Sequence, residues 1–219
     1  MDTKQKSNLL SLWGTELISS AIVLLCLFLA VYFPAQGLLQ SLSRAFFILF
    51  LLPALYIKFI LKQNLSDFGF NLRNPKVGFS WATGMLIVSF LIIFILIRFS
   101  DFENNYLIPA YLAKNFGLFL FYELIVINFI LFLYEFFFKG FLLFSLTKNL
   151  GFLAIFIQAL VFILFMTIIG IMDWEMAPTA ILAFTGGIVA YKSRSFIYSY
   201  LMGLIFTLFL DAYIIHIFK

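Results

Sequence analysis

The sequence predicts an all-α, polytopic transmembrane helical bundle, on the basis of its composition and its hydrophobic pattern. Of the 219 residues, 64% are hydrophobic and only 11% are charged, whereas soluble domains are about 45–50% apolar and about 25% charged. Long apolar runs recur without the alternation that a membrane β-barrel requires. Such a chain cannot cover its surface with polar groups in water, so we expect an integral membrane protein.

The apolar runs predict about seven spans, with a range of six to eight, because about 20 apolar residues cross the hydrocarbon core as a helix. The second and sixth runs are short enough to be partly re-entrant, and the fourth is long enough to tilt. The predicted spans are residues 9–32, 45–61, 77–98, 117–145, 151–171, 177–191 and 195–217.

The segments between the spans predict one integral membrane domain over residues 1–219, because no linker, repeat or low-complexity tract separates them. The first span is too long for a signal-peptide core and lacks a small-residue cleavage site, so we expect it to be retained. Residues 62–76 alternate polar and apolar side chains and end at Asn74-Pro75, which predicts an extended or one-turn segment at the membrane interface. Residues 99–115 predict an outer loop, with an interfacial helix as the alternative.

The distribution of lysine and arginine predicts the orientation, since cytoplasmic loops are enriched in both. The predicted inside carries Lys4, Lys6, Lys62, Arg73, Lys76, Lys148, Lys192 and Arg194. The predicted outside carries Arg44, Arg98, Lys114 and Lys219 with the acids Asp101, Glu103, Asp173 and Glu175. We therefore expect a cytoplasmic N-terminus and an outside C-terminus, with the bacterial cytoplasmic (inner) membrane as the location.

The scarcity of metal-binding and nucleophilic motifs limits the chemistry of the chain. One cysteine, Cys26, excludes an intramolecular disulfide, and one histidine excludes a His-rich zinc site. No H-E-x-x-H, G-x-S-x-G or Walker motif occurs. We expect no cofactor and no metal, and the net charge of +4 is explained by the inside loops without a nucleic-acid partner.

Charged residues inside the fourth span are the strongest local signal, because charge within an apolar helix is normally either paired or functional. Glu135 and Lys139 are four residues apart in the favourable order for a helical ion pair. We expect Lys139 to neutralise Glu135 and to extend toward the cytoplasmic interface.

Glu123 has no such local partner, which makes it a candidate for a contact across helices or for a position near the outer interface. At about 100° per residue it shares a helix face with Tyr134, eleven residues later. Asp211 is a further candidate, deep in the last span. The candidate binding or acid–base residues are therefore Glu123, Tyr134, Glu135 and Asp211.

Four blocks follow one another along the chain: "SDFGFNLRNPKVGF", "YEFFFKGFLLFSLTKNLG", "IQALVFILFMTIIG" and "FTGGIVAYKSRSFIYSYLMGLIFTLFLD". Their order and spacing resemble the CPBP family, the CAAX-protease and bacteriocin-processing (Abi) membrane proteins. The resemblance covers roughly residues 65–211, and its most specific block is "YEFFFKGF", similar to the family's E-E-x-x-x-R-G-F. The resemblance implies a helical bundle with a cavity in which glutamate and histidine side chains activate water for cleavage of membrane-presented peptides.

Carrying the motif over residue by residue implies that this site is inactive. The water-activating glutamate falls on Tyr134, while the second glutamate and the arginine fall on Glu135 and Lys139. The phenylalanine and histidine of the next block fall on Phe162 and Met166. The last block falls on Gly203 and Thr207, or, four residues later, on Thr207 and Asp211, and neither register supplies its histidine. A tyrosine with an unperturbed pKa of about 10 is a poor general base near neutral pH.

Three functional hypotheses follow. The leading one is a catalytically inactive CPBP-like protein that binds a membrane protein, a transmembrane helix or a lipidated peptide in the inherited cavity. The runner-up is a divergent endopeptidase that uses Glu123, Glu135 or Asp211 as its base. The third is a small transporter or channel subunit with a carboxylate-lined route, although no inverted repeat is visible. The phenylalanine-rich faces of residues 136–145 and 152–165 are expected to contact lipid or a partner helix.

Overall fold

The structure is a computed structural model that describes residues 3–102, 106, 115–170, 174 and 176–217, with side chains from residue 17 to residue 216. These residues form helices and turns, and no strand occurs among them. Sequence-based predictions for residues 103–105, 107–114, 171–173, 175 and 218–219, and for the side chains of residues 1–16, lie outside this part of the chain.

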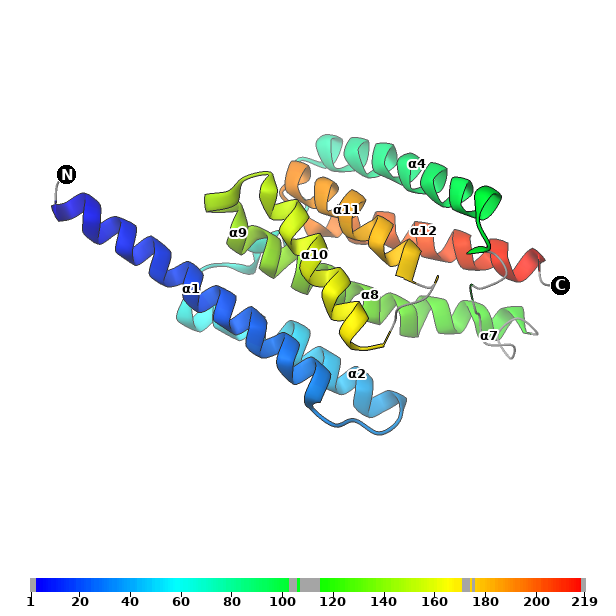
Figure 1. The fold of residues 1–219 in the computed structure, drawn as a ribbon, viewed down its shortest axis with the longest axis horizontal. Helices are drawn as coiled ribbons and strands as arrows, with labels where there is room; N and C mark the ends of the chain where they lie inside the picture. Colours follow the sequence, from blue (N-terminus) through cyan, green and yellow to red (C-terminus); the bar gives the residue numbers. More distant parts are fainter. Residues whose placement is uncertain (1–2, 103–105, 107–114, 171–173, 175, 218–219) are drawn as a thin grey trace.

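Seven helical segments lie where the seven spans are predicted (Figure 1). Five are single helices, and two contain π-helical turns. In chain order they are α1 (Thr3–Tyr32), the segment from α2 (Leu38–Phe46) through α3 (Leu52–Leu55) to Ile60, α4 (Pro75–Phe99), the segment α7 (Phe116–Phe121), α8 (Asn128–Tyr134) and α9 (Leu143–Leu150), α10 (Leu153–Ile168), α11 (Met176–Ser193) and α12 (Phe196–Ile217).

Four of these segments are long and apolar enough to cross a membrane, namely 38–60, 75–99, 116–150 and 196–216. Two shorter apolar helices cover 17–32 and 153–168. The number of crossings stays a prediction. The second segment begins at Leu38 rather than at residue 45, so the expectation of a short second span is wrong. The polar residues Ser41 and Arg44 lie within its first helical turns and do not interrupt it.

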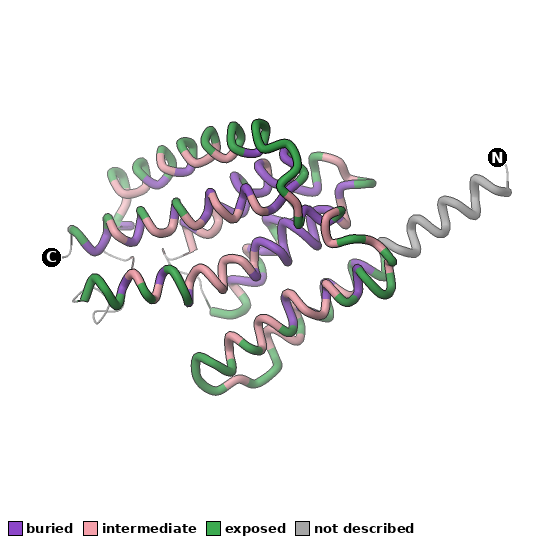
Figure 2. Tube along the Cα trace, turned by 180° about the vertical axis from the view of Figure 1, so that it is seen from behind, coloured by how far each residue is buried: buried purple, intermediate pink, exposed green. Residues whose placement is uncertain are grey.

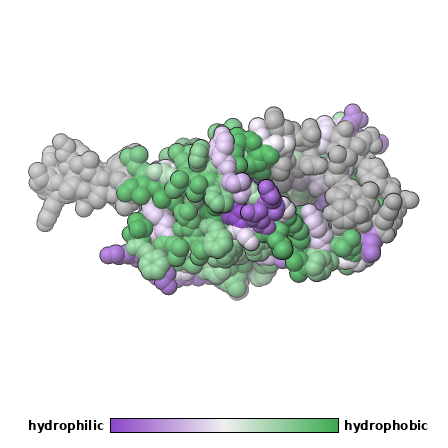
Figure 3. Space-filling view, turned by 90° about the horizontal axis from the view of Figure 1, so that it is seen from below, coloured by the Kyte–Doolittle hydropathy of each residue, from purple (hydrophilic) through white to green (hydrophobic). Residues whose placement is uncertain are grey.

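The surface of the described part is the surface of a membrane protein. Figure 3 shows hydrophobic side chains over most of the coloured face, with hydrophilic residues gathered in a compact area and toward the ends. Exposed large apolar side chains are frequent, including Phe94 at 63% exposure on α4 and Phe209 at 63% on α12. Soluble proteins rarely expose apolar patches of this extent to water, so we conclude that lipid covers these faces.

The core is centred on the π-helical segment η5 (Glu135–Leu142), in which all eight residues are buried. Figure 2 shows burial concentrated in the middle of the bundle, whereas the outer face of α4 and the chain around α2 are exposed. Phe136, Phe137, Phe138 and Phe141 are at most 1% exposed. The prediction that the face from residue 136 onward contacts lipid is therefore wrong for this stretch, because η1 (Phe47–Leu51), α10, α11 and α12 pack against it.

Two π-helical segments interrupt the long fourth segment, η4 (Tyr122–Ile127) and η5. A π turn holds more residues than an α turn, so it rotates the following side chains around the helix axis, and such turns are frequent at functional sites. This rotation decides which neighbour each polar residue of the segment faces.

At one end of the bundle, the loop before α4 is fastened to the connection between α11 and α12. It contains the 3₁₀ turn Leu65–Phe68 and ends at Pro75, the first residue of α4, as the predicted one-turn segment requires. Gly69 has φ +81°, and a Cβ atom there would lie 2.4 Å from the Phe144 ring. Only glycine fits this close approach with this backbone conformation.

Candidate functional site

The Glu135–Lys139 ion pair lies at the centre of the bundle. Lys139 Nζ donates a hydrogen bond to Glu135 Oε1, and the two side chains are only 6% and 3% exposed. The predicted pairing is therefore confirmed. The expectation that Lys139 extends to the interface is wrong, because its ammonium group points inward, toward α11 and α12.

A glycine makes room for the ammonium group. A Cβ atom at Gly186 on α11 would lie 2.3 Å from Lys139 Nζ and 2.4 Å from Ser199 Oγ on α12. Gly187, its neighbour, has the Gln158 amide 2.8 Å from the position of a Cβ atom. The glycine pair thus lets the buried side chains of Lys139 and Gln158 approach the α11 backbone. This role is more specific than the close packing of helices that small residues are expected to allow.

Beside the ion pair is a small cavity of about 50 Å³. Two acceptor atoms in its lining residues, Glu135 Oε2 and Gln158 Oε1, have no hydrogen-bond partner among the described residues, and nor does the nearby Ser199 Oγ. The Gln158 amide donates to Ala183 O at 2.7 Å, which orients the side chain. A cavity needs roughly 10–15 Å³ for each water molecule, so this cavity has room for a few waters but not for a peptide.

Of the positions that the resemblance aligns with the family's motifs, Tyr134, Glu135, Lys139 and Phe162 line this cavity, and Met166, Gly203 and Thr207 do not. Tyr134 and Phe162 line it, with their ring centroids 5.9 Å apart. Gly203 lies opposite the ion pair, since a Cβ atom there would be 3.6 Å from Glu135 Oε1. Met166 is 2% exposed, in the same core cluster as Phe162, and the Thr207 hydroxyl donates to Gly203 O at 3.0 Å.

The chemistry of this group is that of a packed core. Its one carboxylate is neutralised by an ammonium, and the phenol of Tyr134 sits among the rings of Phe138, Phe162 and Phe165. The residue that the resemblance aligns with the family's water-activating glutamate is thus a phenol, and a phenol with an unperturbed pKa of about 10 is a poor general base near neutral pH. Within the described residues, no group of three His, Cys, Asp or Glu side chains is placed to hold a metal ion.

Glu123 and Tyr134 do not share a face, contrary to the prediction. Tyr134 faces α10 through Phe162 and Phe165, whereas Glu123 forms a side-chain hydrogen bond with Asp211 on α12. The π turns of η4 explain the difference, because counting 100° per residue fails wherever a turn holds an extra residue.

The Glu123–Asp211 pair forms a second polar centre, nearer the other end of the bundle. The two carboxyl groups are 5% and 9% exposed. Asp211 Oδ1 also accepts a hydrogen bond of 2.8 Å from the Tyr106 hydroxyl. The pair therefore links the fourth helical segment to α12 through buried polar groups. The structure thus joins two residues that the sequence marked separately.

We expect Glu123→Gln to change the free energy of unfolding by less than about 1 kcal/mol, because the amide N–H of glutamine can donate a hydrogen bond to Asp211. Glu123→Leu should cost about 1–3 kcal/mol, because it removes a partner from a buried acceptor. Unfolding by sodium dodecyl sulfate in mixed micelles measures both. Equal losses in the two variants would mean that no hydrogen bond links the pair.

Comparison of the chain with protein-family models, with curated protein sequences and with solved structures gives no match. The resemblance to the CPBP family therefore stays a prediction from the order of the sequence blocks. The chemistry of the two polar centres is therefore inferred from their geometry alone.

Proposed function

We propose that this protein is a non-catalytic, CPBP-like membrane protein that binds a hydrocarbon chain carried by a lipid-anchored peptide. The observation that carries the non-catalytic part is the environment of Tyr134, the residue that the resemblance aligns with the family's water-activating glutamate. Its phenol packs among the rings of Phe138, Phe162 and Phe165.

The central cavity is too small to receive the partner. Binding pockets for small molecules measure about 300–1,000 Å³, whereas the cavity beside Tyr134 measures about 50 Å³. Binding through the inherited cavity, the leading hypothesis from the sequence, is therefore replaced by binding at the outer surface.

A groove between α4 and α12 has the size and the chemistry that the central cavity lacks. Its volume is about 530 Å³, and it is lined by Ile87, Phe90, Leu91, Ile93, Phe94, Ile97, Phe209, Leu210 and Tyr213. Helix pairs in membranes meet through small residues, and this lining consists of large aliphatic and aromatic side chains. A slender hydrocarbon chain fits between such side chains better than a second helix does.

Photo-crosslinking tests the proposal. The probe is a palmitoylated peptide with a diazirine on its acyl chain, added to the protein in lipid nanodiscs. We expect labelling to concentrate on the groove residues of α4 and α12 and to be competed by unlabelled lipidated peptide but not by the unlipidated peptide. Leu91→Trp, which fills the groove, should lower labelling at least several-fold.

The matched control is Leu164→Trp, because Leu164 on α10 is 52% exposed and Leu91 is 57% exposed, and Leu164 does not line the groove. Labelling spread evenly over all exposed helices, or an equal loss in both variants, would show that the groove holds only bulk lipid. The peptide should remain uncut throughout.

The endopeptidase hypothesis is favoured by one observation, the close approach of the buried carboxyl groups of Glu123 and Asp211. Two carboxyl groups that share a proton can act as an acid–base pair in peptide hydrolysis, and Glu135 is withdrawn from that role by Lys139. Cleavage of the same peptide that is abolished by both Glu123→Gln and Asp211→Asn would support this second function over the first.

A further inference from the structure

A polar pocket lies at the end of the bundle where α4 and α12 begin. Its volume is about 330 Å³, and it lies between the loop before α4, the α11–α12 connection and the side chain of Phe144. Its polar lining residues are Ser66, Asp67, Asn71, Arg73, Asn74 and Arg194. It differs from the central cavity and from the apolar groove in both place and chemistry.

Hydrogen bonds between residues more than 120 positions apart in the sequence hold the walls of the pocket together. The Asn71 amide donates to Ser66 O at 2.7 Å and to Arg194 O at 3.2 Å. Ser195 Oγ donates to Asn71 O, and the Tyr198 hydroxyl donates to Leu72 O at 3.0 Å. The loop is thus held in place without a ligand, so a ligand would meet a preformed pocket.

Two arginines give the pocket its charge. Neither Arg73 nor Arg194 has an ion-pair partner among the described residues, and the Arg194 guanidinium lies 5.6 Å from the centre of the Tyr191 ring. Asp67 is the one acid of the lining, and its carboxylate accepts a hydrogen bond of 3.2 Å from the Asn64 backbone. The pocket therefore offers two planar, unpaired guanidinium groups, which suit the oxygens of a phosphate group.

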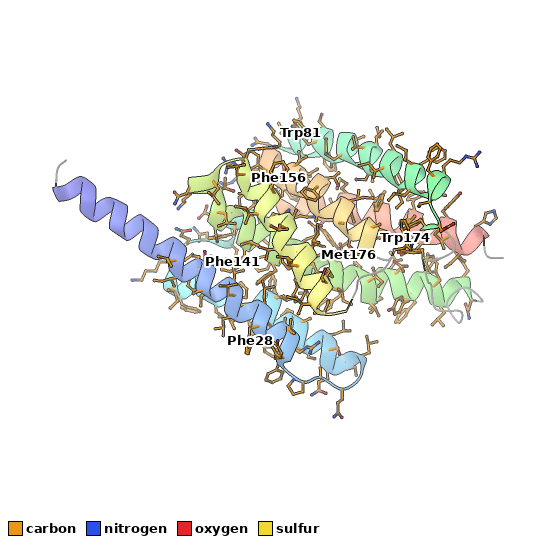
Figure 4. All side chains as sticks on the ribbon, viewed as in Figure 1. Phe28, Trp81, Phe141, Phe156, Trp174 and Met176 are labelled. Carbon is orange, nitrogen blue, oxygen red and sulfur yellow. The ribbon has the colours of Figure 1, made fainter. Side chains whose placement is uncertain are left out.

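Further basic side chains surround this end of the bundle. Lys192 Nζ lies 5.4 Å from the centre of the Trp81 ring, and Figure 4 shows Trp81 near the start of α4, at the same end as Phe156 and opposite Trp174. Lys76 and Lys148 are exposed at the start of α4 and near the end of α9. The pocket thus lies where apolar helices end in a basic rim, at the level of the lipid head groups.

We propose that this pocket binds a phosphate-bearing anion, with the phosphate held between Arg73 and Arg194. The head group of an anionic phospholipid supplies this chemistry from the membrane, and a small phosphorylated solute supplies it from water. The site is independent of the groove between α4 and α12, and each can be present without the other.

Native mass spectrometry of the protein in a neutral detergent tests the proposal, with phosphatidylglycerol and glycerol phosphate as separate probes. We expect one phosphatidylglycerol to be retained and its affinity to fall at least tenfold in the double variant Arg73→Gln/Arg194→Gln. Arg73→Lys should lose part of the affinity, because a lysine cannot make the two parallel hydrogen bonds of a guanidinium.

The control is Arg98→Gln, at the opposite end of α4, which should retain the lipid. Equal retention in the wild type and the double variant, or an equal loss in Arg98→Gln, would overturn the proposal. Retention of phosphatidylglycerol alone identifies a membrane lipid as the ligand, and arginine-dependent binding of glycerol phosphate identifies the solute. Arg73→Gln alone guards against misfolding, because the hydrogen bond from Arg73 to the Asn71 side chain is donated by the backbone N–H, which the substitution keeps.

Discussion

The Lys139→Met variant is expected to lose about 3–5 kcal/mol of unfolding free energy, because removing one partner of a buried ion pair leaves the other charge without compensation. Both side chains are almost fully enclosed, so bulk water cannot replace the lost ammonium group. Methionine has a similar length and no charge, so the change tests the pairing rather than the packing.

Replacing both partners should restore most of this loss. Apolar residues of similar volume are often as stable as a buried ion pair or more stable, so Glu135→Met/Lys139→Met should lie closer to the wild type than Lys139→Met does. The control is Lys148→Met on α9, where the lysine is exposed. Unfolding in mixed micelles measures all three variants. A Lys139→Met loss no larger than that of Lys148→Met would show that the pair does not stabilise the fold.

The ion pair and the helical segments are the parts that the sequence predicts well. Local spacing determines both: an uninterrupted apolar run needs no information about its neighbours to become a helix, and residues four apart meet on any regular helix. The pairing of Glu135 with Lys139 also survives within the π-helical segment η5, because the two side chains remain one turn apart.

The partners across helices could not be predicted from spacing alone. Glu123 was expected to act with Tyr134 and instead meets Asp211, because π turns change the rotation of the helix and leave no clear mark in the sequence. Gln158 and Ser199 were visible only as polar residues in apolar helices. Their association with Glu135 and Lys139 depends on how α10, α11 and α12 pack, and on the missing side chain of Gly186.

The three cavities differ in chemistry. The central one is small and lies beside an ion pair, with space for only a few waters; the lipid-facing groove is apolar; and the pocket at the end of the bundle is basic. A binding role for the outer two requires that the helices around the centre stay fixed, which a buried ion pair can supply. The variants of Lys139 and the variants of the outer sites therefore test different properties, stability and binding.

The Gly78→Ala variant is expected to lose about 1–3 kcal/mol of unfolding free energy, the usual range for overpacking a core. A Cβ atom at Gly78 would lie 2.4 Å from two ring atoms of Tyr198. Tyr198 is 1% exposed, its ring packs against Phe79 at 5.3 Å, and its hydroxyl holds Leu72 O. The ring cannot move aside without breaking these contacts.

Gly84→Ala on the same helix is the matched control, because no atom lies within 4 Å of a Cβ atom at that position. It should be neutral or gain up to about 1 kcal/mol, since alanine is the better helix former. Equal stability of the two variants in mixed micelles would contradict the close contact of α4 with Tyr198. Because the Tyr198 hydroxyl also fastens the loop that forms the basic pocket, Gly78→Ala should weaken phosphatidylglycerol retention as well, and Gly84→Ala should leave it unchanged.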